Sequence, residues 1–472
     1  MICILSKRWS ALVCLLAVLT GRALAQGVDI DQDFPSFKIY DDILAKNPKN
    51  AVAYRERGTA YYHQKDFTNA IADFTQAIAL NPKDTLAYTG RGVSHFKNGN
   101  GGDALDDLKH AVRLNPNSAS IYRHLIDVCF FNEDWDNVIS NATQLIRVNP
   151  SESAWACETR GEAWQYKSNF DRAIKEFDAA IRLNPNWDAP HRERASILEK
   201  KGDFDGVLAD LNELVRLDPH NDQNYYTRSH IYREKSDWDG IIANWTEAIA
   251  NNPTNTDYLY TRARAYQNHN KDFAKAIADY NKIVELEPNK PRHYMARGFA
   301  YERENLFEMA ITNYSELIQL NPTNSDGYLG RAGAYFHDGQ YKEARKDFDR
   351  GIQLNPENWA GYTGLAYFLA ICPDASFRNG REALKMAQKG YDLNQPPEAW
   401  ISVHCASALA VAYAEVGNFD NAIRYQKQAL DTVSNAQGWG LAKEDLEKMK
   451  ECLALFEQHK PYREPTKSQP KP

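Results

Sequence analysis

The stretch AVAYRERGTAYYHQKDFTNAIADFTQAIALNPKD, residues 51–84, decides the fold because related stretches follow one another along most of the chain. Each stretch ends near a proline, and these prolines recur every 34 residues, or in two cases every 35. They are Pro48, Pro82, Pro116, Pro150, Pro185, Pro219, Pro253, Pro288, Pro322 and Pro356. A proline cannot continue a helix, so each one marks the end of a helical segment. Repetition at this period predicts a solenoid of helical units.

Small and aromatic residues recur inside each unit at set positions. When the proline is counted as position 32, position 8 is Gly58 in the first unit and is small in ten of eleven units, with Ile126 as the exception. An aromatic residue such as Phe67 stands at position 17 in most units. A small residue lets two helices approach closely, and a ring fills the turn between them. The pattern predicts two packed helices per unit.

The segments 54–61 (YRERGTAY) and 69–78 (NAIADFTQAI) resemble the tetratricopeptide repeat family. The resemblance covers roughly residues 35–436. It implies an all-α fold in which antiparallel helix pairs stack into a right-handed superhelical solenoid. We expect about eleven units, an N-terminal half-unit and a C-terminal capping helix. The inner groove of this family usually binds peptides or partner proteins.

The two 35-residue intervals locate two insertions. We expect one in the 151–153 connection and one in the 268–270 turn, because loops absorb added residues at little cost. A longer insertion, 375–381, delays the second helix of the unit that contains Cys372-Pro373-Asp374. This module resembles the C-terminal part of many exported bacterial tetratricopeptide repeat proteins.

The ends of the chain differ from the repeats. Residues 1–25 have two basic residues, a short apolar run and the site Ala23-Leu24-Ala25, which together predict a signal peptide and export to the periplasm or beyond. We expect a linker at 26–34, the solenoid at 35–436, a capping helix at 437–460 and a disordered tail at 461–472. The apolar run near the start is too short to span a membrane, and no later segment looks transmembrane.

Charge and motifs exclude several classes of function. The formal net charge is −7, and removal of residues 1–25 would make it −10 because Lys7, Arg8 and Arg22 would be lost with no acid. An acidic scaffold is a poor binder of nucleic acid. No catalytic, phosphate-binding or metal-binding motif occurs, so we expect no enzyme activity, no cofactor and no metal.

Five cysteines would remain after export. Cys129 and Cys157 stand at core positions, where they fit as small apolar fillers, although a disulfide stays open. Cys372 and Cys405 are the better candidates for a disulfide.

Charged residues also recur with the repeat. Position 7 is arginine in eight units, and position 23 is acidic in six of these and asparagine in the other two. The arginines are Arg57, Arg91, Arg160, Arg194, Arg228, Arg262, Arg297 and Arg331. Their partners would be Asp73, Asp107, Glu176, Asp210, Asn244, Asp279, Asn313 and Asp347. Because a guanidinium matches a carboxylate or amide oxygen, we expect a structural ladder rather than anion binding.

Positions 2, 5, 9, 12 and 13 of the first helix usually line the concave face in this family. In units two to six we therefore expect ligand-binding residues at Phe96, Arg123, Asp127, Phe130, Phe131, Trp155, Glu158, Tyr166, Arg192, Tyr226 and Arg233. Aromatic side chains would anchor a peptide, and charges would set its direction. The alternative is that Phe130 and Trp155 pack between repeats.

The resemblance implies an exported, non-catalytic scaffold that binds a protein or peptide partner in its groove. A binder of polysaccharide or peptidoglycan in the cell envelope is the alternative, because concave aromatics could stack on sugars. A low-specificity assembly factor for envelope proteins is a third hypothesis. Partner, pathway, organism and oligomeric state stay open.

Overall fold

The computed structural model describes residues 37–394, 398–435 and 443–465. The predicted signal peptide, 1–25, and linker, 26–34, lie outside these residues. So do 437–442 of the predicted capping helix and 466–472 of the predicted tail.

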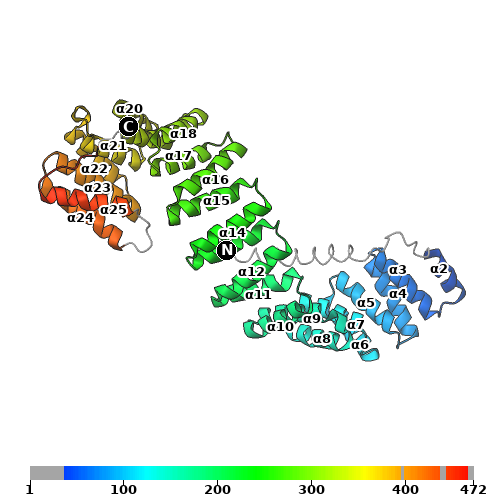
Figure 1. Ribbon diagram of the computed structural model, residues 1–472. Helices are drawn as coiled ribbons and strands as arrows, with labels where there is room; N and C mark the ends of the chain where they lie inside the picture. Colours follow the sequence, from blue (N-terminus) through cyan, green and yellow to red (C-terminus); the bar gives the residue numbers. More distant parts are fainter. Residues whose placement is uncertain (1–36, 395–397, 436–442, 466–472) are drawn as a thin grey trace. The chain divides into compact units, whose positions relative to one another are not determined.

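The regular secondary structure of the described residues is helical, and helices that follow one another in sequence pack side by side (Figure 1). The first helices of the units are α3 (Ala51–His63), α5 (Thr85–Lys97), α7 (Ala119–Phe131), α9 (Ser153–Tyr166), α11 (Asp188–Lys201), α13 (Asp222–Glu234), α15 (Thr256–Ala265), α17 (Pro291–Arg303), α19 (Ser325–Asp338), α21 (Trp359–Ile371) and α23 (Ala399–Glu415). The second helices are α2 (Phe37–Lys46), α4 (Phe67–Leu80), α6 (Gly101–Leu114), α8 (Trp135–Val148), α10 (Phe170–Leu183), α12 (Phe204–Leu217), α14 (Trp238–Asn251), α16 (Phe273–Leu286), α18 (Phe307–Leu320), α20 (Tyr341–Leu354), α22 (Gly380–Asp392) and α24 (Phe419–Asn435). A final helix, α25, spans Lys443–Glu457. The predicted all-α solenoid of helix pairs is confirmed.

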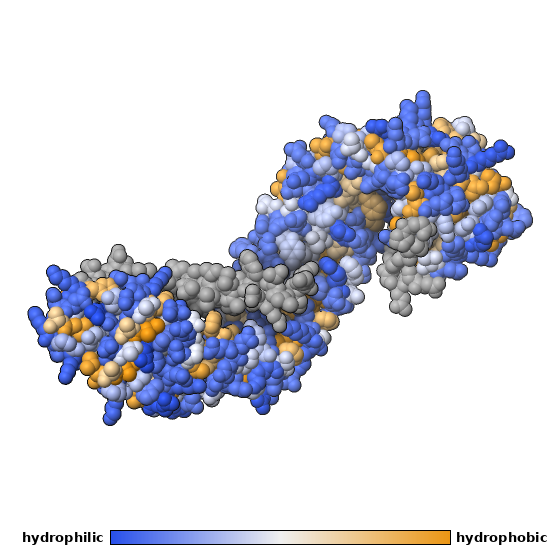
Figure 2. Space-filling model, turned by 180° about the vertical axis from the view of Figure 1, so that it is seen from behind, coloured by the Kyte–Doolittle hydropathy of each residue, from blue (hydrophilic) through white to orange (hydrophobic). Residues whose placement is uncertain are grey.

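The chain forms two compact units that divide after Asp210, inside α12. The N-terminal unit holds α2 to α11 and the first half of α12. The C-terminal unit holds the rest of the chain. Figure 2 shows mostly hydrophilic residues on the visible surface, with apolar ones between them.

Caps and turns explain where the helices begin and end. Asn50 and Asp66 accept a hydrogen bond from the backbone N–H three residues on, so they cap α3 and α4. The turn within each pair except α21–α22 contains a residue with positive φ, such as Lys65 at 63° or Gly202 at 73°. A left-handed residue at that point ends the first helix and lets the chain reverse.

Small residues at position 8 bring the two helices of a unit together. A Cβ built on Gly161 would lie 2.7 Å from Cε1 of Phe177, a side chain that is fully buried. Ala195, Ala263 and Ala332 fill the same position in other units and are buried. The predicted reason for small residues at this position is therefore confirmed.

The arginine ladder is present in all eight units predicted to carry it. Each position-7 arginine donates to the position-23 oxygen of its own unit, with a shortest distance of 2.6–2.7 Å. Each arginine also donates through Nη1 to a residue 16 or 17 positions earlier, on the second helix of the preceding unit, at 2.5–3.2 Å. These acceptors, at position 25, are Asp41, Thr75, Thr143, Asp178, Asn212, Thr246, Asn281 and Ser315. One guanidinium therefore joins three helices.

The insertions lie where the intervals place them. The first forms the 3₁₀ helix η1, Pro150–Glu152, and the second forms the π-helix η2, Tyr266–Asn270, at the end of α15. The longer insertion after Pro373 contains a further 3₁₀ turn, η3 (Ala375–Phe377).

The C-terminal segment differs from the sequence prediction. Helix α25 ends at Glu457, and residues 461–465 dock on the solenoid instead of starting a disordered tail. Tyr462 is buried, and the N–H of Glu464 donates to the carbonyl of Ile371 at 3.0 Å. The tail docks at the end of α21 because its backbone donates to Ile371 and because Nη1 of Arg463 donates to the carbonyl of Ala370 at 3.2 Å, while Tyr462 joins the apolar cluster of this region.

The five described cysteines are free and buried, so Cys372 and Cys405, the better candidates for a disulfide, form none in this structure. The Cys405 thiol donates to the carbonyl of Gly390 at 3.4 Å, and burial raises its pKa to about 12. Cys129 and Cys157 are small apolar fillers, as one of the two interpretations predicted.

Candidate functional site

Several predicted binding residues of the N-terminal unit come together as ring contacts. Phe96 and Phe131 meet edge to face with their centroids 5.5 Å apart. Tyr166 stacks on Trp135 at 4.3 Å, and Phe130 packs edge-on against both rings. Helices α5, α7, α8 and α9 therefore carry two groups of ring contacts, one between α5 and α7 and one among α7, α8 and α9, which together are called the aromatic cluster.

The exposed apolar side chains of this unit follow a clear rule. On its first helices, the large hydrophobic residues that are exposed stand at the predicted groove positions 2 and 13. They are Val52, Leu86, Phe131 and Tyr166, which are 53%, 63%, 60% and 57% exposed. Exposed apolar residues that recur at two set positions of the repeat indicate a surface for contact.

Other predicted residues have structural partners. Phe130 and Trp155 pack against the apolar cluster that contains Leu125 and Cys129, in agreement with the packing interpretation. Arg123 pairs with Glu152, and its guanidinium lies 5.1 Å from the centre of the Trp155 ring. This pair holds α7 to the start of α9.

Acidic side chains lie beside the aromatic cluster. Glu158 is 9% exposed on α9, and burial together with Glu193 raises its pKa to about 7. Burial, Glu158 and Glu193 also raise the pKa of Glu162 well above its usual value. Asp127 is half-buried on α7. The face offers carboxylates in a partly desolvated setting, where a cationic group would be favoured.

The remaining predicted residues do not extend this cluster. Arg192 is exposed and pairs with Asp188 on the same helix at 2.8 Å. Tyr226 and Arg233 belong to the C-terminal unit, where the Tyr226 ring contacts Trp245 at 5.0 Å and Arg233 is exposed. The predicted residues are therefore divided between the two units, and all the aromatic ones except Tyr226 belong to the first.

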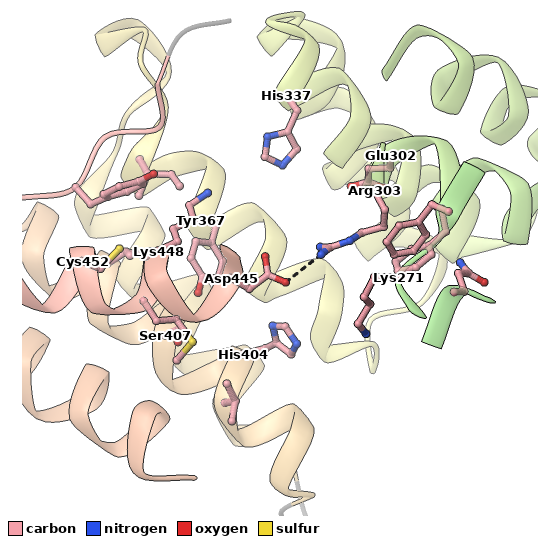
Figure 3. Close-up of a pocket in the computed structure, with 18 of the residues that line it drawn as sticks. Lys271, Glu302, Arg303, His337, Tyr367, His404, Ser407, Asp445, Lys448 and Cys452 are labelled. Carbon is pink, nitrogen blue, oxygen red and sulfur yellow. Dashed lines mark hydrogen bonds and ion pairs between the residues drawn. The ribbon is translucent and has the colours of Figure 1, made fainter. Parts of the chain in front are cut away.

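A second candidate site was missed. The C-terminal unit has a partly open cavity of about 860 Å³ between its first helices and α25 (Figure 3). Its walls come from η2, α17, α19, α21, α23 and α25, with contributions from Trp238, Phe273, Gln426 and Tyr462. The volume is in the range of small-molecule sites, roughly 300–1,000 Å³.

The spacing rule used for units two to six could have found this cavity. Phe299, Arg303, His337, Tyr367 and Ser407 stand at groove positions 9, 13, 13, 9 and 5 of later units. What no spacing rule supplies is α25, which follows no repeat register and brings Asp445, Lys448, Met449 and Cys452 to the cavity.

Charged groups of both signs face the cavity. Arg303 and Asp445 point toward each other, with 3.3 Å between Nη2 and Oδ2, and Lys271 lies nearby (Figure 3). Lys448 pairs with Glu464 at 2.6 Å. Burial raises the pKa of Glu302 to about 7, and its carboxylate accepts a hydrogen bond from Tyr314.

The described residues contain no cluster of three or more His, Cys, Asp or Glu suited to a metal ion. Within the same residues, none of the helices combines the length and apolar character needed to cross a membrane.

Family models described as "Tetratricopeptide repeat" match residues 51–84, 159–222, 226–291, 292–324, 325–358 and 402–433, together more than half of the chain. The chain therefore belongs to the tetratricopeptide repeat proteins. No curated protein matches it in sequence.

Several solved structures are similar to the chain at low identity. Yeast Tom70 has 20% identity and a TM-score of 0.37, over 90% of this chain and 91% of Tom70. A tetratricopeptide repeat protein from Parabacteroides merdae has 21% identity and a TM-score of 0.44, over 57% of this chain and 98% of that one. YrrB, described as having an unusual peptide-binding site, has 18% identity and a TM-score of 0.33, over 39% of this chain and 95% of YrrB.

Proposed function

We propose that the protein is an exported, non-catalytic interaction scaffold whose N-terminal unit binds an extended peptide segment of a partner protein. The observation that carries the proposal is the register of Val52, Leu86, Phe131 and Tyr166, exposed at groove positions of successive first helices. An extended peptide that crosses the first helices would meet these side chains at the start of α3 and α5 and at the end of α7 and α9, and rigid aromatic rings bind at low entropic cost.

The partner's chemistry follows from the groups beside the rings. Asp127, Glu158 and Glu162 stand at groove positions on α7 and α9. A peptide that alternates apolar residues with lysine or arginine would satisfy both the rings and the carboxylates. The arginine ladder supports this function indirectly, because it holds neighbouring units in one register before binding.

A selection experiment tests the proposal. Random 12-residue peptides on phage would be selected against the chain that starts at Gln26, and enriched peptides would be measured by fluorescence anisotropy. We expect sequences with aromatic and basic residues. The double variant Phe131→Ala/Tyr166→Ala should weaken their binding at least about tenfold, the loss typical of removing interface anchors.

The matched control is Leu183→Ala, which removes an equally exposed apolar side chain, 56% exposed, from the second helix α10. It should leave binding unchanged, and circular dichroism melting should be the same for all three proteins. Equal binding by the double variant and the wild type would contradict the peptide groove.

One observation favours a second candidate, a binder of cell-wall glycan. The Tyr166 ring is exposed and lies parallel to the Trp135 ring. An exposed aromatic ring of this kind is a surface on which a sugar could stack. Retention of the wild type on insoluble peptidoglycan, lost in Tyr166→Ala, would support it. Retention that a high salt concentration abolishes would instead indicate charge contact with wall polymers.

Export is part of the proposal and has its own test. The bases, the apolar run and the Ala23-Leu24-Ala25 site support cleavage before Gln26. Mass spectrometry of the protein from a bacterial expression host should find Gln26 as the N-terminus. An N-terminus at Met1 in the cytoplasmic fraction would contradict export.

A further inference from the structure

The cavity of the C-terminal unit depends on features that a repeat array does not need. The extra residue of the seventh unit forms η2, and this π-helix places Gln267 and Asn268 on the cavity wall. Gln267 is buried and its Oε1 accepts a hydrogen bond from Tyr280 at 2.8 Å, which fixes the wall. Single π-helical turns occur frequently at functional sites.

Two cations converge at one end of the cavity. Lys271 follows η2 directly, and Arg303 ends α17, so both reach the cavity from the same side, near Asp445 (Figure 3). Burial and the positive charge of Arg303 lower the pKa of Lys271, which shows that the two cations repel each other. The carboxylate of Asp445 offsets part of this repulsion for both of them. A further anion between Lys271 and Arg303 would be stabilised by both charges.

A buried acceptor points to a ligand with a hydrogen-bond donor. Gln426 is 1% exposed and lines the cavity, and its Nε2 donates to the carbonyl of Met449 at 3.0 Å. Its Oε1 has no partner among the residues that the structure describes. Buried polar atoms are nearly always hydrogen-bonded, so a bound molecule or water is expected at this atom.

Aromatic rings supply the rest of the wall. Trp238, Phe273, Phe299, Tyr367 and Tyr462 line the cavity, and Phe299 is 48% exposed although it stands in the middle of α17. An apolar enclosure with a few polar groups at defined points is the usual form of a small-molecule site.

We propose that this cavity binds a small aromatic carboxylate, with the carboxylate between Lys271 and Arg303 and an N–H or O–H group within reach of Gln426. The site lies wholly in the C-terminal unit. It is independent of the peptide groove, so either proposal can fail without the other.

Calorimetric titration tests the charge requirement. The probes are benzoate, hippurate and indole-3-acetate, each compared with its own primary amide, which keeps the shape and removes the charge. We expect at least one acid to bind with Kd below about 1 mM and its amide to bind at least about tenfold more weakly, as for loss of a charge-assisted hydrogen bond. Failure of all three acids to bind, or equal affinity for acid and amide, would overturn the proposal.

Substitutions of Lys271 test whether the carboxylate of the ligand binds beside this residue. Lys271→Asn removes the charge and suits the backbone, because φ is 52° at this position and asparagine tolerates the left-handed region. It should weaken binding about tenfold, whereas Lys271→Arg should keep it. The control Lys275→Gln removes an exposed lysine of α16 that does not line the cavity, and it should change nothing. Unaltered binding by Lys271→Asn would overturn the assignment.

The hydrogen-bond requirement has a separate readout. Gln426→Leu removes the buried acceptor and should weaken the binding of indole-3-acetate, which has a ring N–H, more than that of benzoate, which has none. An equal loss for the two acids would show that Gln426 only supports α25.

Discussion

The same positions of the repeat have different surroundings in the two units. In the N-terminal unit the groove positions of successive first helices keep apolar side chains in solvent, as at Leu86 and Phe131. In the C-terminal unit the corresponding positions of the later first helices, such as Tyr367, line the cavity together with α25, whose own Phe456 and Cys452 are buried. The same periodic surface can therefore stay open for a partner or be closed by the chain itself, and the difference depends on residues outside the repeats.

Removing a ring from the closed groove should have the largest effect. Phe456 is fully buried, so Phe456→Ala should lower the free energy of unfolding by about 3–5 kcal/mol. Urea unfolding followed by circular dichroism measures this loss. Phe131→Ala is the matched change in the open groove and should cost less than about 0.5 kcal/mol, as exposed sites usually do. Similar losses of unfolding free energy for Phe456→Ala and Phe131→Ala would contradict the difference between the two grooves.

The second-largest loss of stability should come from breaking the arginine ladder, which occurs in both units. Asp210 is fully buried between Arg194 and His191, so Arg194→Met should cost about 3 kcal/mol by leaving a buried carboxylate with one partner fewer. Arg192→Met removes an exposed arginine two residues away and should change stability by less than about 0.5 kcal/mol.

A double-mutant cycle separates this coupling from simple truncation. Arg160→Met and Glu176→Leu, which break the 2.6 Å pair of another unit, should show a coupling energy above about 0.5 kcal/mol. Additive losses would mean that the interaction between Arg160 and Glu176 contributes nothing to the free energy of unfolding.

The acid cluster of the open groove should make the N-terminal unit sensitive to pH. Folding raises the pKa of Glu158 from 4.5 to about 7, because burial and Glu193 disfavour the ionised form. The native state thus holds the proton more tightly, and this contribution to stability is present at low pH and is lost as the pH rises from 4.5 toward about 7. Glu158→Gln should reduce the fall in the free energy of unfolding between about pH 5 and pH 8 by about 1–2 kcal/mol.

Asp106→Asn is the control for this change, because it removes an exposed carboxylate of the same unit. Its pH dependence should match that of the wild type. A Glu158→Gln profile parallel to the wild type would show that Glu158 titrates normally in the folded protein.

The sequence predicted the parts of the fold that repeat and missed the parts that do not. The period, the small residue at Gly161 and the pairing of Arg194 with Asp210 all follow from spacing, because each helix pair must solve the same packing problem. The contact from Arg194 to Asp178 was missed, since its acceptor varies among Asp, Thr, Asn and Ser from unit to unit and has no residue signature. The cavity was missed because it needs α25, whose docking depends on contacts such as Arg303–Asp445 between residues far apart in the sequence.

The candidate site was predictable to a similar degree. The groove register named Phe131 and Tyr166, and both rings are exposed in the structure. It could not separate them from Trp155, which stands at another groove position but packs against the core. Which ring turns inward depends on neighbours such as Arg123 and Glu152, and the register does not encode them.

The reach of each ladder arginine into the preceding unit limits how such a chain can be rearranged by gene duplication. A unit carrying arginine at position 7 can follow any unit that has a small or acidic acceptor at position 25. The second unit instead has Lys109 at that position, and the third unit has Leu125 where the arginine would stand. A copy of the third unit alone could be placed after many neighbours, but an arginine-bearing unit placed after the second would set two cations face to face. These two units are expected to be inherited as a pair.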